Sequence, residues 1–186
     1  PIWVDADTGY GNAVNVHRTG RRLAAAGTAA VMIVDQAWPK RCGHMAGNSV
    51  IDFEEAIAKV EAAAAARDDH APELLLKART DAATTRGLAE AIDRLQAFAD
   101  AAADVVFADA LPSEPDIRRV AEAGQPVGAA VGIAEDTVER AGAALDAGAN
   151  CVMVDVAHGH LERCLDAVET LDAEFPDADV VAGNVA

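Results

Sequence analysis

Short apolar runs rich in β-branched residues alternate with alanine-rich stretches along this 186-residue chain. The runs lack the alternating polar positions of a sheet face open to water, so they are typical of strands buried on both faces. Strands and helices in alternation predict a parallel sheet covered by helices. The predicted strands are residues 2–5, 31–34, 74–78, 105–108, 127–131, 151–154 and 180–182. The predicted helices are residues 14–26, 52–67, 87–102, 114–123, 135–147 and 160–174.

Polar residues follow nearly every predicted strand at its carboxyl end. A Gly-rich GxGxxG turn, the main sign of a dinucleotide-binding sheet, does not follow the first strand. In a (β/α)₈ TIM barrel the carboxyl ends of the strands meet at one mouth, where the active site lies. Because seven strands fall short of eight, we expect an α/β, TIM-barrel-type single domain over residues 1–186 that is incomplete or recombined. The polar residues are Asp5, Asp7, Asp35, Gln36, Arg79, Asp81, Asp109, Asp155, His158 and Asn184.

The charge balance restricts the partners of the chain. Acidic residues number 31 against 15 Lys and Arg, for a net charge of −16. Such a surface repels nucleic-acid phosphates and anionic lipid, so we expect no nucleic-acid and no membrane partner. Asp is commoner than Glu and Lys is nearly absent, a composition that resembles proteins from a high-salt cytoplasm. The three cysteines are an odd number without tight spacing, which favours a reducing, cytoplasmic location over a disulfide framework or a zinc site.

Asp5 and Asp7 are spaced i and i+2 at the end of the first predicted strand. This spacing predicts that both carboxylates face the same side of the strand. Two such carboxylates need a nearby cation, and their hard oxygen atoms suit Mg²⁺. The alternative is that the pair only caps a helix and forms a turn.

Two further groups of residues carry chemistry. Residues 40–44 (KRCGH) place two cations, a thiol and an imidazole together, and adjacent positive charge favours the thiolate of Cys42. The alternative is a basic surface turn. Arg79 ends a strand, and its planar fork suits either a substrate carboxylate or a structural ion pair with Asp81. His158 and His160 have no third soft ligand nearby, so a zinc site there is improbable.

Four motifs occur in order over about 110 residues: residues 3–12 (WVDADTGYGN), 34–44 (beginning VDQ and ending PKRCGH), 77–82 (KARTDA) and 107–110 (FADA). In these motifs residues 1–125 resemble the isocitrate lyase/phosphoenolpyruvate mutase superfamily, and the methylisocitrate lyase type most of all. The resemblance implies a TIM barrel with Mg²⁺ held by Asp5 and Asp7 beside a small anionic carboxylate substrate. It also implies that Cys42, with Lys40 and His44, forms the catalytic loop. Arg79, Asp109 and Gly43 would bind the substrate.

Residues 126–186 have a different resemblance. Residues 127–132 (VGAAVG), 154–160 (VDVAHGH) and 182–186 (AGNVA) resemble consecutive strands of IMP dehydrogenase, which is also a (β/α)₈ barrel. That family has its cofactor site beside the segment that corresponds to Asp155, so Asp155 is a candidate cofactor-binding residue. The chain therefore resembles two barrel segments joined near residue 125.

Two positions depart from the lyase pattern. The superfamily usually has Glu where Val34 stands, and Glu again where Asp109 stands. The loss of the first acid weakens the inference of a magnesium site. The shortening at Asp109 moves its carboxylate by more than about 1 Å, which is enough to spoil a positioned contact. We also expect that a complete lyase would have further strands before Pro1, and that residues 126–186 end before the cysteine loop of IMP dehydrogenase.

Three functions are compatible with these features. The first is a Mg²⁺-dependent carbon–carbon lyase, or related enolate chemistry, on a small keto or hydroxy di- or tricarboxylate. The second is a nucleotide-binding barrel fragment related to IMP dehydrogenase without oxidoreductase activity. The third is an inactive barrel scaffold that self-associates to cover its open sheet edges, and a homo-oligomer is expected in any case.

The excess of acids predicts that salt stabilises the fold. The Debye length falls from about 10 Å at 0.1 M salt to about 3 Å at 1 M, which screens repulsion between surface carboxylates. We therefore expect the melting temperature to rise between 0.1 M and 2 M KCl, as followed by circular dichroism. A melting temperature that does not respond to KCl would contradict the halophilic interpretation.

Overall fold

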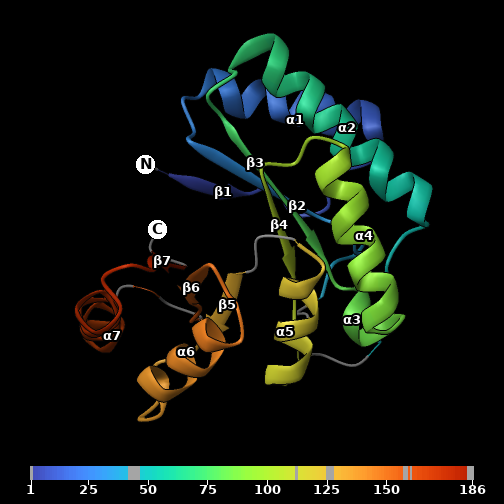
Figure 1. The fold of residues 1–186 in the computed structure, drawn as a ribbon. Coiled ribbons are helices and arrows are strands. Elements are labelled where there is room, and N and C mark those ends of the chain that lie inside the picture. The colour runs from blue at the N-terminus through green and yellow to red at the C-terminus, as the bar shows by residue number, and fades with distance from the viewer. Residues whose placement is uncertain are drawn as a thin grey trace. The chain divides into compact units, whose positions relative to one another are not determined.

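The computed structural model describes residues 2–41, 47–111, 113–124, 128–156, 159 and 161–183. The chain divides into two compact units, Pro1–Leu111 and Pro112–Ala186 (Figure 1). All seven predicted strands are present, within one or two residues of the predicted positions. Their pairing is parallel throughout, which confirms the parallel α/β class. The described strands form two sheets, of four and three strands, so these residues do not form the closed ladder of a complete barrel.

The first unit is a sheet in the order β1-β2-β3-β4 with helices in the crossovers. Figure 1 shows α1, α2 and α4 on one side of this sheet. The sequence did not predict the short helix α3. The elements are β1 (Trp3–Asp5), α1 (Ala13–Ala25), β2 (Ala30–Val34), α2 (Phe53–His70), β3 (Leu75–Thr80), α3 (Ala82–Thr85), α4 (Leu88–Asp100) and β4 (Val105–Ala108).

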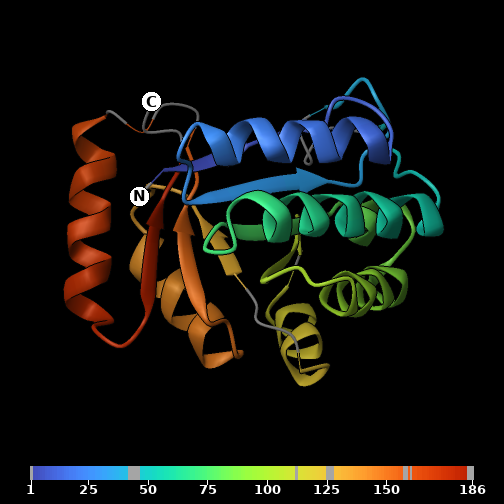
Figure 2. The same ribbon diagram turned by 90° about the horizontal axis from the view of Figure 1, so that it is seen from above.

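Helices α1 and α2 pack closely because small residues lie between them. Gly20 of α1 is buried against α2, and a Cβ atom at this position would lie 3.0 Å from the Cβ of Ala66. The sequence of α2 supplies several buried alanines on the facing side. Figure 2 shows the two helices lying side by side along the sheet. In this alanine-rich chain with 4% aromatic residues, the contact between α1 and α2 is thus made by small residues.

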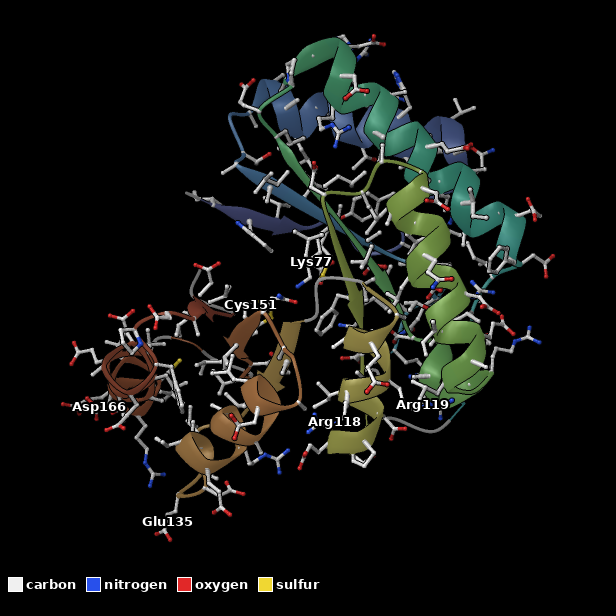
Figure 3. The ribbon with its side chains drawn as sticks, viewed as in Figure 1. Lys77, Arg118, Arg119, Glu135, Cys151 and Asp166 are labelled. Atoms are coloured by element: carbon white, nitrogen blue, oxygen red, sulfur yellow. The ribbon has the colours of Figure 1, made fainter. Side chains whose placement is uncertain are left out.

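The second unit has the sheet order β5-β6-β7. Its core gathers apolar side chains from the strands and from α6 and α7, including the buried thiol of Cys164. Figure 3 shows Glu135 and Asp166 pointing outward from this unit, in agreement with the acidic surface. The elements are α5 (Glu114–Glu122), β5 (Gly128–Val131), α6 (Thr137–Asp146), β6 (Cys151–Val154), α7 (Glu162–Glu174) and β7 (Asp179–Ala182).

One buried ion pair ties α4 to the first sheet. Arg94 is 1% exposed, and its Nη1 atom donates to Oδ2 of Asp35, at the end of β2, over 3.1 Å. The Nη2 atom of Arg94 donates to the carbonyl of Ile51 and to Glu90. Burial raises the pKa of Asp35, although hydrogen bonds from Thr80 and Asp81 and the charge of Arg94 oppose this rise. The pair fixes the carboxyl end of β2 relative to the helix layer.

No helix of the described residues is long and apolar enough to cross a membrane.

Replacement of Arg94 by Met should lower the free energy of unfolding by about 3–5 kcal/mol, because it leaves the Asp35 carboxylate buried without its cation. Urea denaturation at pH 7 measures this loss. The exposed Arg21 of α1 provides the matched control, and Arg21→Met should change the stability by no more than about 0.5 kcal/mol. Equal effects of the two substitutions would contradict the structural role of the pair.

The loss in Arg94→Met should also depend on pH. Without Arg94 the pKa of Asp35 rises further, so the folded variant binds this proton at a higher pH than the unfolded chain does. The stability of the variant relative to wild type should therefore fall as the pH rises from the pKa of Asp35 in the unfolded chain to its pKa in the folded variant. It should recover as the pH is lowered.

Candidate functional site

The carboxyl ends of β1 to β4 bring a cluster of charged side chains together in the first unit. Arg79, in β3, lies between two carboxylates. Its Nε and Nη2 atoms donate to Asp81 over 2.7 and 3.2 Å. The Nη2 atom also donates to Oδ2 of Asp109, just after β4, over 2.6 Å. The ion pair of Arg79 with Asp81, one of its two predicted roles, is therefore formed.

Neighbouring carboxylates stabilise the positive charge of Arg79. Burial acts to lower its pKa. The hydrogen bond and charge of Asp81, together with the charges of Asp109 and Asp5, outweigh burial and raise the pKa of the guanidinium above its ordinary value. Arg79 is thus a permanent cation beside the strand ends. Its Nη1 edge makes no hydrogen bond to a described residue, so it can donate to an added anion.

Asp5 and Asp7 lie close together, but not for the reason that the sequence predicted. Strand β1 ends at Asp5, and Asp7 lies beyond it in a turn with a φ angle of 55°. The two-residue alternation of a strand therefore does not apply to Asp7. Instead, the backbone N–H of Asp7 donates to Oδ1 of Asp5 over 2.8 Å, and Oδ1 of Asp7 accepts from the N–H of Thr8 over 2.7 Å. The turn-forming role that was the alternative is thus observed.

Lys40 approaches this turn from the segment after β2. Its Nζ atom lies 3.0 Å from Oδ2 of Asp5. The ion pair places a predicted catalytic residue beside a predicted metal ligand. Cys42, Gly43 and His44 lie outside the described residues, so their predicted roles stay predictions.

Lys77 belongs to the same face of the sheet, and sequence reasoning did not identify it as a site residue. It stands two residues before Arg79 on β3 (Figure 3), and both cations lie against the ring of Phe107. The Lys77 Nζ atom is 4.3 Å from the centre of this ring and 5.5 Å from that of Trp3. The i, i+2 spacing from Arg79 was the available signal. This face of the sheet therefore presents two cations.

Asp155, the candidate cofactor residue, belongs to the second unit. It is exposed after the carboxyl end of β6, and its N–H donates to the carbonyl of Val131 over 3.0 Å. No hydrogen bond described for it indicates a ligand. His158 and His160 lie outside the described part of the chain.

A cavity of about 420 Å³ adjoins the charged cluster in the first unit. Gln36 lines it, whereas Asp5, Arg79 and Asp109 do not. The buried ammonium of Lys59 donates to the carbonyl of Thr8 over 3.2 Å, and burial lowers its pKa. Because Gln36 lines the cavity and also donates to Asp81, the cavity lies beside the charged cluster. The lining residues are Thr8, Tyr10, Gly11, Gln36, Trp38, Ile51, Glu55 and Lys59.

Asp5 and Asp7 could bind a magnesium ion, but the described residues do not surround one. Among the described residues no three His, Cys, Asp or Glu side chains gather into a metal-holding group. Val34, where the superfamily usually has Glu, is a buried apolar residue of β2. Magnesium is commonly bound by only one or two carboxylates together with water and substrate oxygens. Asp5 and Asp7 could supply the carboxylates. The donor set consists of oxygen atoms and so fits Mg²⁺.

Comparison with known proteins identifies the relatives of the chain. The family described as phosphoenolpyruvate phosphomutase matches residues 1–134. The 2,3-dimethylmalate lyase of Eubacterium barkeri is 43% identical over 122 residues, which are 66% of this chain and 42% of that protein. The 2-methylisocitrate lyase of Aeropyrum pernix is 46% identical over 121 residues, 65% of this chain and 38% of that protein. The matched part thus spans about two fifths of the length of these curated relatives.

Solved structures extend the likeness. A crystal structure of 2,3-dimethylmalate lyase, described as a PEP mutase/isocitrate lyase superfamily member, matches 95% of this chain and 59% of its own. The TM-score is 0.75 and the sequence identity 31%. A structure of oxaloacetate acetylhydrolase with 3,3-difluorooxalacetate matches 97% of this chain and 61% of its own, with a TM-score of 0.76 and 30% identity.

These matches support the resemblance stated for the first part of the chain. They do not support a likeness of residues 126–186 to IMP dehydrogenase, which stays an untested interpretation. The sequence match of residues 1–134 covers the first unit, and with it the whole of the charged cluster. The chain belongs to the phosphoenolpyruvate phosphomutase family, within the PEP mutase/isocitrate lyase superfamily.

Proposed function

We propose that this chain is a carbon–carbon lyase that acts on a small 2-hydroxy or 2-keto di- or tricarboxylate, in the manner of isocitrate and methylisocitrate lyases. The observation that carries the proposal is the position of Arg79. It is a permanent cation at the strand ends, held by Asp81 and Asp109, with one edge of its guanidinium available. A carboxylate of the substrate is the natural partner of that edge.

The other described residues support the same chemistry. Lys40 and Asp5 form an ion pair that brings the segment before Cys42 to the end of β1. Lys77 lies on the face that carries Arg79, where its buried ammonium packs against the ring of Phe107. Relatives at 43–46% identity are lyases that cleave dimethylmalate and methylisocitrate, according to their names.

In the proposed reaction the bond between the hydroxyl-bearing carbon and its neighbour breaks. The hydroxyl group loses its proton to water and becomes the carbonyl of a 2-keto acid, while the electron pair of the broken bond passes to the second product. Cys42 would donate a proton to the carbanion carbon of that product. Mg²⁺, when bound at Asp5 and Asp7, would supply Lewis-acid stabilisation of negative charge on oxygen. Arg79 would orient the substrate through its carboxylate.

The carboxylate of Asp109 contacts Arg79. Where the superfamily usually has Glu, Asp109 places its carboxylate 2.6 Å from Nη2 of Arg79. We infer that this residue orients Arg79 and acts on the substrate through it. Asp155 and a nucleotide are not part of this proposal, because no contact of the described residues favours them. A homo-oligomer stays a prediction from the sequence.

The test of the proposed function is the release of a 2-keto acid. The purified chain with Mg²⁺ should release pyruvate or glyoxylate from at least one of 2-methylisocitrate, isocitrate and 2,3-dimethylmalate, detected by reduction of the product with NADH and a dehydrogenase. Release from none of the three would contradict the proposal.

Arg79→Lys should raise the KM for the active substrate about 10- to 100-fold, because an ammonium keeps the charge but loses the planar fork. Steady-state kinetics measures the change. Arg118→Lys on the exposed surface of α5, labelled in Figure 3, is the matched control and should behave as wild type. A KM unaffected by Arg79→Lys would show that this guanidinium does not bind substrate.

Millimolar Mg²⁺ should raise the melting temperature, since a ligand that binds only the folded state stabilises it. Asp7→Ala should abolish this increment and keep the response to KCl. The exposed Asp166 of α7 supplies the control, because Asp166→Ala leaves both responses in place. An Mg²⁺ increment that persists in Asp7→Ala would rule out the proposed metal ligand.

A further inference from the structure

Gln36 occupies a position that the proposed function leaves unexplained. It follows β2 directly and is 1% exposed. Its Nε2 atom donates to the carbonyl of Arg41 over 2.9 Å, and its Oε1 atom accepts from the N–H of Arg41, also over 2.9 Å. A side-chain carboxamide thus pairs with both backbone groups of a single residue, as one β-strand residue pairs with another. This two-point contact fixes the backbone of Arg41.

The third hydrogen bond of Gln36 leads to the charged cluster. The Nε2 atom also donates to Oδ2 of Asp81 over 2.5 Å. The same Asp81 oxygen accepts from Nη2 of Arg79, and the other Asp81 oxygen accepts from Nε of Arg79. Both N–H groups of the carboxamide and its oxygen are then used, so its orientation is determined. Gln36 is separated from the guanidinium of Arg79 by one carboxylate.

Gln36 also anchors the far end of the segment that begins at residue 37. Its backbone forms an antiparallel bridge with Val50. On either side of this bridge the N–H of Ala37 donates to the carbonyl of Ser49, and the N–H of Ile51 donates to the carbonyl of Asp35. The side chain of Gln36 therefore holds Arg41, and the backbone hydrogen bonds of its neighbours Asp35 and Ala37 keep Gln36 opposite Val50. Gln36 and its two neighbours thus constrain Arg41 and Val50, which are nine residues apart in the chain.

We propose that Gln36 is a positioning residue that fixes the backbone of Arg41 relative to the Asp81–Arg79 pair. A cation that binds the substrate carboxylate and the chain segment that leads to Cys42 are then kept in one geometry. The carboxamide is required because no other side chain of this length offers two N–H donors and one acceptor. Glutamate would lack both donors and would face Asp81 with a second negative charge. The catalytic consequence rests on the proposed function, whereas the fixation of Arg41 does not.

Limited proteolysis tests the fixation without any activity. Arg41 is exposed, and trypsin cleaves after Lys and Arg where the backbone can open. In Gln36→Met, a substitution of similar length, the loss of three hydrogen bonds should raise the initial rate of cleavage after Lys40 or Arg41 about 10-fold. The rate is taken by mass spectrometry relative to cleavage after Arg21 in the same sample, which cancels any general loss of stability.

The control is Gln96→Met on the exposed side of α4, which should leave the cleavage ratio at the wild-type value. Should Gln36→Met fail to fold, Gln36→Asn replaces it, since the amide is kept but is one methylene too short to reach both partners. An unchanged cleavage ratio in the folded Gln36 variant would overturn the proposal.

Kinetics tests the catalytic half. With the substrate that the wild-type chain cleaves, Gln36→Met should lower kcat about 10- to 100-fold and leave KM within about twofold, because a misplaced backbone spoils the geometry of the reaction and Arg79 still binds the carboxylate. An unchanged kcat would overturn the positioning role. An inactive wild-type chain whose Gln36 variant shows the raised cleavage ratio would refute the proposed function and support the fixation of Arg41.

Discussion

The ion pair of Arg79 with Asp81 and Asp109 is the interaction on which the site depends. Acidic side chains crowd the strand ends of the first unit, and without a cation among them their repulsion would raise the cost of burying them. Arg79 lies 2.7 Å from Asp81 and 2.6 Å from Asp109, and so links the end of β3 to the residue that follows β4. Arg79, Asp81 and Asp109 all belong to the first unit, so this unit forms the interaction from its own residues.

A second, more deeply buried ion pair, between Arg94 and Asp35, supports this one. Asp35 accepts hydrogen bonds from the hydroxyl of Thr80, the N–H of Asp81 and the guanidinium of Arg94. These bonds hold the backbone of Asp81 in place and connect it to α4. The orientation of Arg79 thus depends on a chain of contacts that runs from the helix layer through two carboxylates to the strand end. This rigidity is what a residue that orients a substrate needs.

The sequence predicted the strands well and the contacts poorly. Runs such as residues 31–34 and 105–108 are apolar throughout, and a buried parallel strand has to be apolar, so their positions followed from pattern alone. Asp7 was placed with Asp5 by strand alternation, but the strand ends at Asp5 and a turn with positive φ takes over. Alternation cannot reveal where a strand stops.

Gln36 and Arg94 show a second limit. Both are polar residues, but Asp81, which Gln36 contacts, and Asp35, which Arg94 contacts, lie 45 and 59 residues away in the sequence. Only the folded register of β2 beside β3 and α4 brings these pairs together. The resemblance to lyases assigned roles to Lys40, Arg79 and Asp5, because these residues match motif positions whose roles are known in that superfamily. Gln36 stands in one of the same motifs, but the resemblance assigned it no role.

The most direct measurement of the central claim is the NMR signal of the Arg79 side chain. The Nε–Hε resonance, assigned by its absence in Arg79→Lys, would be followed while succinate is added to the full chain in the presence of Mg²⁺. We expect a saturable shift of this resonance, with the signal of the exposed Arg118 unmoved. An Arg79 resonance that stays in place while succinate reaches saturating, millimolar concentration would contradict the claim that this cation receives the carboxylate of the substrate.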